Sequence, residues 1–189
     1  MADSAVETIL RKQQVNPLGL TTWRPIGLDL DVCVPQWMRN NFAKGLYPTL
    51  EERIAFAQSA CDYVEGSLVQ AMSVLPEGHS LGAIVSFSFV NTDLRDTFRK
   101  RFPKSKWFLI DTSEDEATER IRRREGHFYK GKVELVAIDE IEARPTTDNQ
   151  EWSFAPVTFQ HTVLNGIEPI DHNAKIVADG LMEIAKETQ

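Results

Sequence analysis

The chain of 189 residues has few cysteines, no long hydrophobic run and no apolar segment at its start. Cys33 and Cys61 lack the spacing of metal ligands, so we expect reduced thiols in an intracellular protein, cytoplasmic or organellar. The best apolar run, LGAIVSFSFV at 81–90, is far too short to cross a bilayer, and no membrane association is expected. Early acidic residues and the lack of a continuous apolar stretch argue against a secretory signal.

Basic residues are fewer than acidic ones. The 21 Lys and Arg residues against 28 Asp and Glu residues give a net charge of −7. A general nucleic-acid binder needs a basic face, so no nucleic-acid partner is expected. The hydrophobic fraction of 42% and the charged fraction of 26% are typical of a globular protein in water, and the length suits a single domain over 1–189.

Hydrophobic periodicity and capping signals predict alternating helices and strands. Thr49 and Glu52 form a capping box that starts a long helix with an apolar stripe. The other predicted helices span 4–13, 35–44, 92–101, a stretch from a cap at Thr112 or Ser113 to Arg124, 132–143 and 173–186. The predicted strands span 26–31, 83–90, 106–113 and 154–164, and 15–25 is expected to be irregular. This alternation predicts an α/β fold whose largely parallel sheet is covered by helices on both faces.

Polar side chains follow the predicted strands, at the edge of a parallel sheet where ligands bind. Asp29 and Asp31 follow the first strand, and one of them could merely cap a helix. The other polar residues near this edge are Ser88, Asn91, Arg95, Arg99 and Asp111.

The stretch RRREGHFYKG at 122–131 is basic within an acidic chain. Arg120 and Arg124 are four positions apart and share one helical face. Two interpretations remain open for this pair. The guanidinium groups could clamp phosphate oxygens, or they could form structural ion pairs with Glu116 or Glu119.

The run RIRRREGHFYK at 120–130 resembles the lid of gluconokinases, which are small P-loop kinases. The stretch DLDVCVPQWMRNNFAKGLYPTLEER at 29–53 resembles their Asp-Gly-Asp-x-x-His-Pro segment and the sequence after it, and Leu94-Arg95-Asp96 resembles a Tyr-Arg-Asp of that family. The residues of 29–53 that match in register are Asp29, Asp31, Pro35, Gly45, Thr49, Glu51 and Arg53. The resemblance extends from Ser4 to the end of the chain.

The resemblance implies a three-layer, P-loop-kinase-like fold and, in an active enzyme, ATP and Mg²⁺ as cofactors. Asp31 would orient or deprotonate the acceptor hydroxyl, and Asp29 would help to hold Mg²⁺. Arg124 would take part in catalysis. Arg53 and Arg95 would hold the substrate.

The same resemblance implies a lid at about 120–132 that closes over ATP. Its cofactor-binding residues would be Arg120, Arg124 and His127.

Parts of the family pattern are absent from the chain. No Gly-x-x-x-x-Gly-Lys-Ser loop occurs in it, and SAVETIL at 4–10 resembles the helix that follows this loop. The strand before the loop, usually the central one, is therefore expected to be missing. The family's His, Asn and Lys are replaced by Val34, Met38 and Asn91, which removes polar groups expected to hold a sugar acid.

These departures favour a pseudokinase that serves as a binding or structural subunit, with a protein partner or as a homo-oligomer. The slot left by the missing strand would be closed by direct strand pairing, by a segment from 15–23 or by a partner chain. The alternative is an active ATP-dependent phosphotransferase for a small hydroxylated, gluconate-like metabolite, with the P-loop supplied by a missing N-terminal segment. A third hypothesis is an anion or nucleotide sensor that uses the lid arginines without chemistry.

Overall fold

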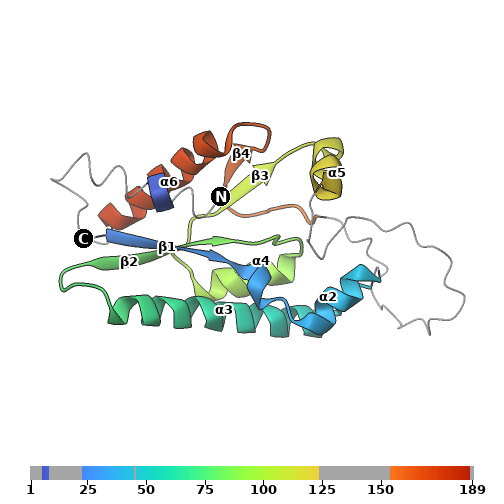
Figure 1. Cartoon of the computed structure of the whole chain (residues 1–189), viewed down its shortest axis with the longest axis horizontal. Coiled ribbons are helices and arrows are strands. Elements are labelled where there is room, and N and C mark those ends of the chain that lie inside the picture. The colour runs from blue at the N-terminus through green and yellow to red at the C-terminus, as the bar shows by residue number, and fades with distance from the viewer. Residues whose placement is uncertain (1–5, 9–22, 45, 124–153, 188–189) are drawn as a thin grey trace, which may run out of the picture.

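The computed structural model describes residues 6–8, 23–44, 46–123 and 154–187 (Figure 1). The predicted helix over 132–143 lies outside these residues, as does most of the predicted irregular stretch over 15–25. Of the predicted helix over 4–13, only 6–8 is described, and these residues are helical.

The first pair of strands is parallel and in register over seven residues, from Trp23 opposite Ser80 to Asp29 opposite Ser86. Its elements are β1 (Trp23–Asp29), η1 (Leu30–Cys33), α2 (Gln36–Ala43), α3 (Leu50–Ser73) and β2 (Ser80–Ser86). The predicted starts of both strands are wrong, because β1 and β2 each begin three residues earlier than expected. Proline lacks an amide hydrogen, and β1 tolerates Pro25 because its described ladder lies on one side only.

The second pair of strands is also parallel, with Phe108 opposite Thr162 and Asp111 opposite Asn165. Its elements, with the helices around it, are α4 (Thr92–Arg101), β3 (Phe108–Asp111), α5 (Glu114–Arg123), β4 (Thr162–Asn165) and α6 (Ile170–Glu187). The predicted strand over 154–164 is wrong in length, since 154–161 has no regular secondary structure. The α/β class and the parallel strands are confirmed.

The described strands form two separate sheets instead of the continuous one expected from the sequence. Within the described residues no ladder joins β2 to β3, so direct strand pairing, one of the expected ways to close the slot, is not observed. Residues 154–161 connect the two sheets instead. Ala155 N donates to Val90 O after β2 at 3.0 Å, and Thr162 N donates to Trp107 O before β3 at 2.8 Å.

The capping box predicted for α3 is confirmed. Glu52 N donates to Thr49 Oγ1 at 3.3 Å, and Thr49 N donates to Glu52 Oε2 at 2.8 Å. These two bonds satisfy amide groups that a helix start leaves without intrahelical partners. The apolar stripe of α3 is buried at Phe56, Ala57, Ala60, Cys61 and Val64, whereas Met72 near the end of the helix is exposed.

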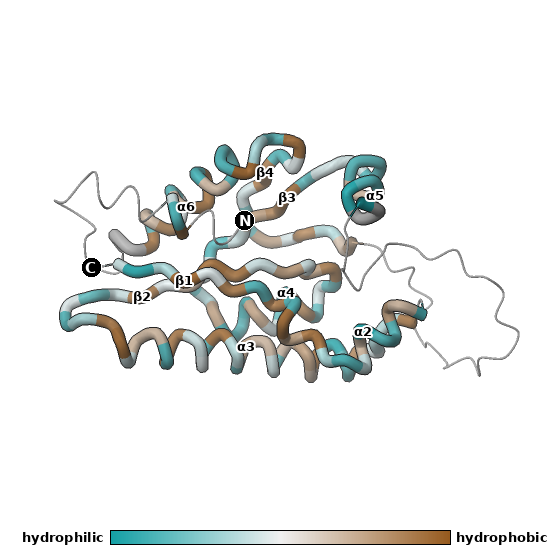
Figure 2. Tube along the Cα trace, viewed as in Figure 1, coloured by the Kyte–Doolittle hydropathy of each residue, from teal (hydrophilic) through white to brown (hydrophobic). Residues whose placement is uncertain are grey.

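Two clusters of buried side chains hold the layers together. One lies between β1, β2, α3 and α4 and includes Leu28, Leu30 and Phe98. The other joins Trp23 and Ile84 of the first sheet to Leu164 of β4 and to Ala174, Val177 and Ala178 of α6. Figure 2 shows that the hydrophobic stretch of β2 lies between α3 and α6. Side-chain packing under α6 therefore joins the two sheets where backbone pairing does not.

The buried thiol of Cys61 is unsuited to reactivity. Burial is the main cause that raises its pKa to about 11, so the thiol stays protonated at neutral pH. Both cysteines are free.

Among the residues that the structure describes, no helix combines the length and the apolar character needed to cross a membrane.

Gly82 on β2 lies under the indole ring of Trp23 on β1. A Cβ at Gly82 would approach Trp23 Cζ2 to 2.3 Å, and Trp23 is buried. We expect Gly82→Ala to lower the free energy of unfolding by about 1–3 kcal/mol, measured by urea denaturation. Gly66→Ala is the control, because a Cβ there meets nothing within 4 Å. Within α3 it should raise stability by about 0.5–1 kcal/mol. Effects of the same sign would contradict the packing of Trp23 on Gly82.

Candidate functional site

The candidate site begins where β1 ends. Asp29 is exposed, and its Oδ1 accepts a hydrogen bond from Asp31 N at 3.0 Å, which caps η1. Asp31 belongs to η1, so the interpretation that one of the two residues caps a helix is confirmed for Asp29. Its main-chain carbonyl and that of Val34 accept hydrogen bonds from Arg39 of α2. The structure therefore places Asp29 and Asp31 at the carboxyl end of β1, joined by this hydrogen bond.

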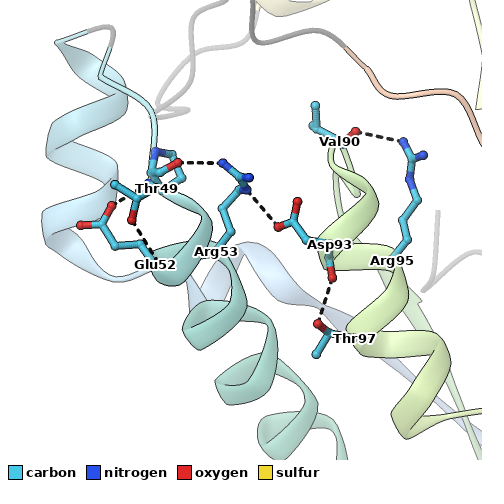
Figure 3. Close-up of polar contacts among 8 residues, drawn as sticks. Thr49, Glu52, Arg53, Val90, Asp93, Arg95 and Thr97 are labelled. Carbon is cyan, nitrogen blue, oxygen red and sulfur yellow. Dashed lines mark hydrogen bonds and ion pairs between the residues drawn. The ribbon is translucent and has the colours of Figure 1, made fainter. Parts of the chain in front are cut away.

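Arg53 of α3 binds groups of the chain itself (Figure 3). Its Nε lies 2.9 Å from Asp93 Oδ2 at the start of α4, and its Nη1 donates to Pro48 O at 3.0 Å. The exposed fractions of the paired side chains are 15% and 19%, so the ion pair is largely screened from water. Arg53 thus joins α3 to α4.

Arg95 of α4 is buried, with 2% of its surface exposed. Its Nε donates to Phe89 O at 2.7 Å, its Nη2 donates to Val90 O at 3.0 Å, and its Nη1 donates to Pro156 O at 3.0 Å. The ring of Phe154 stacks on the guanidinium at 4.5 Å. Burial lowers the pKa of Arg95, since it disfavours the charged form, and the nearby Asp96 acts in the opposite direction. Figure 3 shows the side chain extending toward Val90.

Arg120 of α5 forms an ion pair with Glu116, as the second of the two interpretations predicted. Its Nε lies 2.7 Å from Glu116 Oε1, and its Nη1 donates to Gly166 O at 2.8 Å. The side chain is 47% exposed, so the ion pair itself contributes little to stability. Arg124 and His127, with most of the predicted lid, lie outside the described residues.

Three buried side-chain oxygens were not predicted from the sequence. Asn91 Oδ1, Thr112 Oγ1 and Asn173 Oδ1 have no hydrogen-bond partner within the described part of the chain. Asn173 is 2% exposed, and its Nδ2 donates to Asn165 O at 2.8 Å, which ties α6 to the end of β4. Polar residues at the junctions of predicted strands and helices could have indicated these positions. The sequence does not show which of their oxygens become buried, because burial depends on the assembled fold.

The described residues fit Mg²⁺ and ATP poorly. No group of three His, Cys, Asp or Glu side chains in the described ranges could hold a metal ion. Asp29 and Asp31 provide carboxylates, but Mg²⁺ in kinases is held by one or two carboxylates together with substrate phosphates. The phosphates in turn need a cradle of backbone amides, and the sequence has no Gly-x-x-x-x-Gly-Lys-Ser loop.

The comparisons with known proteins give a likeness in structure. No family model matches the chain, and no curated protein is similar to it in sequence. The structure is similar to the crystal structure of an unliganded sugar kinase from Janibacter sp. HTCC2649, with a TM-score of 0.55. The two share 14% sequence identity over 97% of this chain and 88% of the other. At this identity the likeness shows the fold alone, so the chain has a kinase-like α/β fold.

Proposed function

We propose that the chain is a catalytically reduced, gluconokinase-like domain that serves as a binding or structural subunit. The main support is the bonding of Arg95, a residue that the family resemblance assigns to substrate binding. Its three nitrogens donate to main-chain carbonyls of the chain itself, and the residue is buried. While the guanidinium is bonded in this way, it cannot hold a sugar acid.

Arg53, the other residue assigned to the substrate, supports the same proposal. Its Nε pairs with Asp93 and its Nη1 with the carbonyl of Pro48. Phosphoryl transfer depends on positioning and on neutralising phosphate charge with Lys, Mg²⁺ and Arg. At this site the described residues offer the carboxylates of Asp29 and Asp31. Both arginines assigned to the substrate are bonded to groups of the chain itself.

A protein partner or a second copy is part of the proposal. Apolar side chains are exposed around the second sheet, namely Ile110, Val163, Ile167 and Ile170. Exposed apolar surface of this kind favours association. The mass of the purified chain in solution, measured by light scattering, gives the oligomeric state.

The test is a calorimetric titration of the 189-residue chain with Mg²⁺-ATP, with and without gluconate. We expect no binding at millimolar ATP and no transfer of phosphate to gluconate. Arg124→Ala tests the assigned catalytic arginine. Arg123→Ala is the matched control, because Arg123 is exposed and pairs with Glu119. Tight ATP binding that Arg124→Ala abolishes and Arg123→Ala preserves would overturn the proposal.

The alternative is an active ATP-dependent kinase of a small hydroxylated, gluconate-like metabolite. The position of Asp29 and Asp31 at the carboxyl end of β1 favours it. In that enzyme a segment outside this sequence would supply the phosphate-binding loop. Phosphate transfer by a longer form of the protein, together with none by the 189-residue chain, would support this alternative.

A further inference from the structure

Residues 154–161, called the strap below, lie over Arg95. Ala155 N donates to Val90 O at 3.0 Å, and Pro156 O accepts from Arg95 Nη1 at 3.0 Å. Val90 O also accepts from Arg95 Nη2, at 3.0 Å. Val90 O, shortly after the end of β2, therefore accepts one hydrogen bond from the strap and one from Arg95.

Phe154 forms the outer cover of this site. Its ring centroid lies 4.5 Å from Arg95 Cζ, and the residue is 52% exposed, whereas Arg95 is 2% exposed. A half-exposed ring thus covers a buried cation. A cation stacked on a half-exposed ring is stabilised only modestly. The cover is therefore weak enough to be displaced by a stronger ligand.

The guanidinium of Arg95 has no carboxylate bonded to it among the described residues. Its hydrogen bonds go to main-chain carbonyls, and the neighbouring carboxylate of Asp96 pairs with Arg99 at 3.4 Å. A buried charge without a counter-ion is costly. Guanidinium groups prefer the paired oxygens of phosphate or carboxylate. The site also lies beyond the carboxyl end of a parallel strand, where ligands bind in such sheets.

We propose that the strap is an autoinhibitory contact that competes with a small oxyanion for Arg95. In the closed state, the guanidinium donates a hydrogen bond to Pro156 O, and the ring of Phe154 covers its face. In the open state, the freed Nη1 and the uncovered face of the guanidinium bind a phosphate or carboxylate group. This inference rests on the proposed function, because the closed state accounts for the reduced site.

Competition for one guanidinium has a measurable consequence in the unmodified protein. An anion that binds only the open state shifts the population toward it. Inorganic phosphate should therefore speed hydrogen exchange of the Ala155 amide, which the closed strap bonds to Val90, in a saturable way. Sodium chloride at the same ionic strength is the control. Exchange at Ala155 that does not respond to phosphate would overturn the proposal.

Removing the cover should strengthen anion binding. We expect Phe154→Ala to bind inorganic phosphate about tenfold more tightly than the unmodified chain, because less affinity is lost to closing the strap. The Arg95 Nε–H resonance in NMR spectra should shift with phosphate in this variant. Val69→Ala, an exposed apolar truncation on α3, is the control and should leave affinity unchanged.

The outcomes distinguish this inference from the proposed function. If phosphate leaves the Arg95 resonance of Phe154→Ala unchanged, the strap proposal fails, while the absence of kinase activity stands. If the unmodified chain phosphorylates gluconate, the proposed function fails first. Should Phe154→Ala not fold, the exchange measurement on the unmodified chain decides.

Discussion

Arg95→Leu should lower the free energy of unfolding by about 2–4 kcal/mol, because it removes three hydrogen bonds of a buried guanidinium and leaves two carbonyls without donors. Phe89 O and Pro156 O lose the donors that Arg95 provides, whereas Val90 O keeps the amide of Ala155. Leucine cannot donate a hydrogen bond, and an acceptor left unsatisfied costs about 1–3 kcal/mol where it is buried. Phe89 is partly buried and Pro156 is exposed, so the carbonyl of Phe89 should account for the larger share. Urea denaturation followed by circular dichroism measures the loss.

Arg99→Leu, one turn further along α4, is the matched control. Arg99 also stacks on a strap residue, Phe159, at 4.2 Å, but its side chain is 44% exposed and its ion pair with Asp96 is long, at 3.4 Å. An exposed pair of this kind contributes about 0–1 kcal/mol. Equal losses in the two variants would show that the main-chain carbonyls do not depend on Arg95.

The helices were predictable from the sequence because their signals are local. The capping box of Thr49 and Glu52 lies within four residues, and it marks the start of α3 in the structure. The predicted helix 92–101 coincides with α4, which carries Asp93 in its first turn and three basic residues in its last. Charges placed in this way stabilise the helix dipole whatever the rest of the fold does.

The strands were predicted less well because distant contacts fix their ends. The β-branched and aromatic run over 83–90 predicted a strand to Val90, yet β2 ends at Ser86. Beyond it, Phe89 N bonds to Phe87 O and Val90 N to Ser88 O, so the backbone turns. The ring of Phe89 packs against Trp107, which lies 18 positions further along the chain. No local pattern encodes such a contact.

The candidate site was predictable in its composition and not in its bonding. Proximity of Asp29 and Asp31 at the end of a strand follows from their spacing. The bonding of Arg95 does not, because an arginine that binds a ligand and one that binds main-chain carbonyls are alike in sequence. One of its acceptors, Pro156 O, belongs to a residue 61 positions away. A buried arginine can be recognised only after the strap has been placed.

Leu164→Ala should lower the free energy of unfolding by about 2–5 kcal/mol. Leu164 on β4 is 1% exposed and belongs to the cluster that includes Trp23 and Ile84 of the first sheet. Truncation removes buried apolar surface and leaves a cavity, which the surroundings fill only in part. Chemical denaturation provides the measurement, with Val163→Ala as the control.

The control separates burial from position in the strand. Val163 is the preceding residue of β4 and is 57% exposed, so its truncation should change stability by about 0.5 kcal/mol or less. The comparison also bears on how the two sheets are held together. Within the described residues they share no ladder, so the cluster around Leu164 must supply much of their attachment. If Leu164→Ala costs no more than Val163→Ala, that cluster does not hold the sheets, and the strap and the α4–β3 connection carry the attachment.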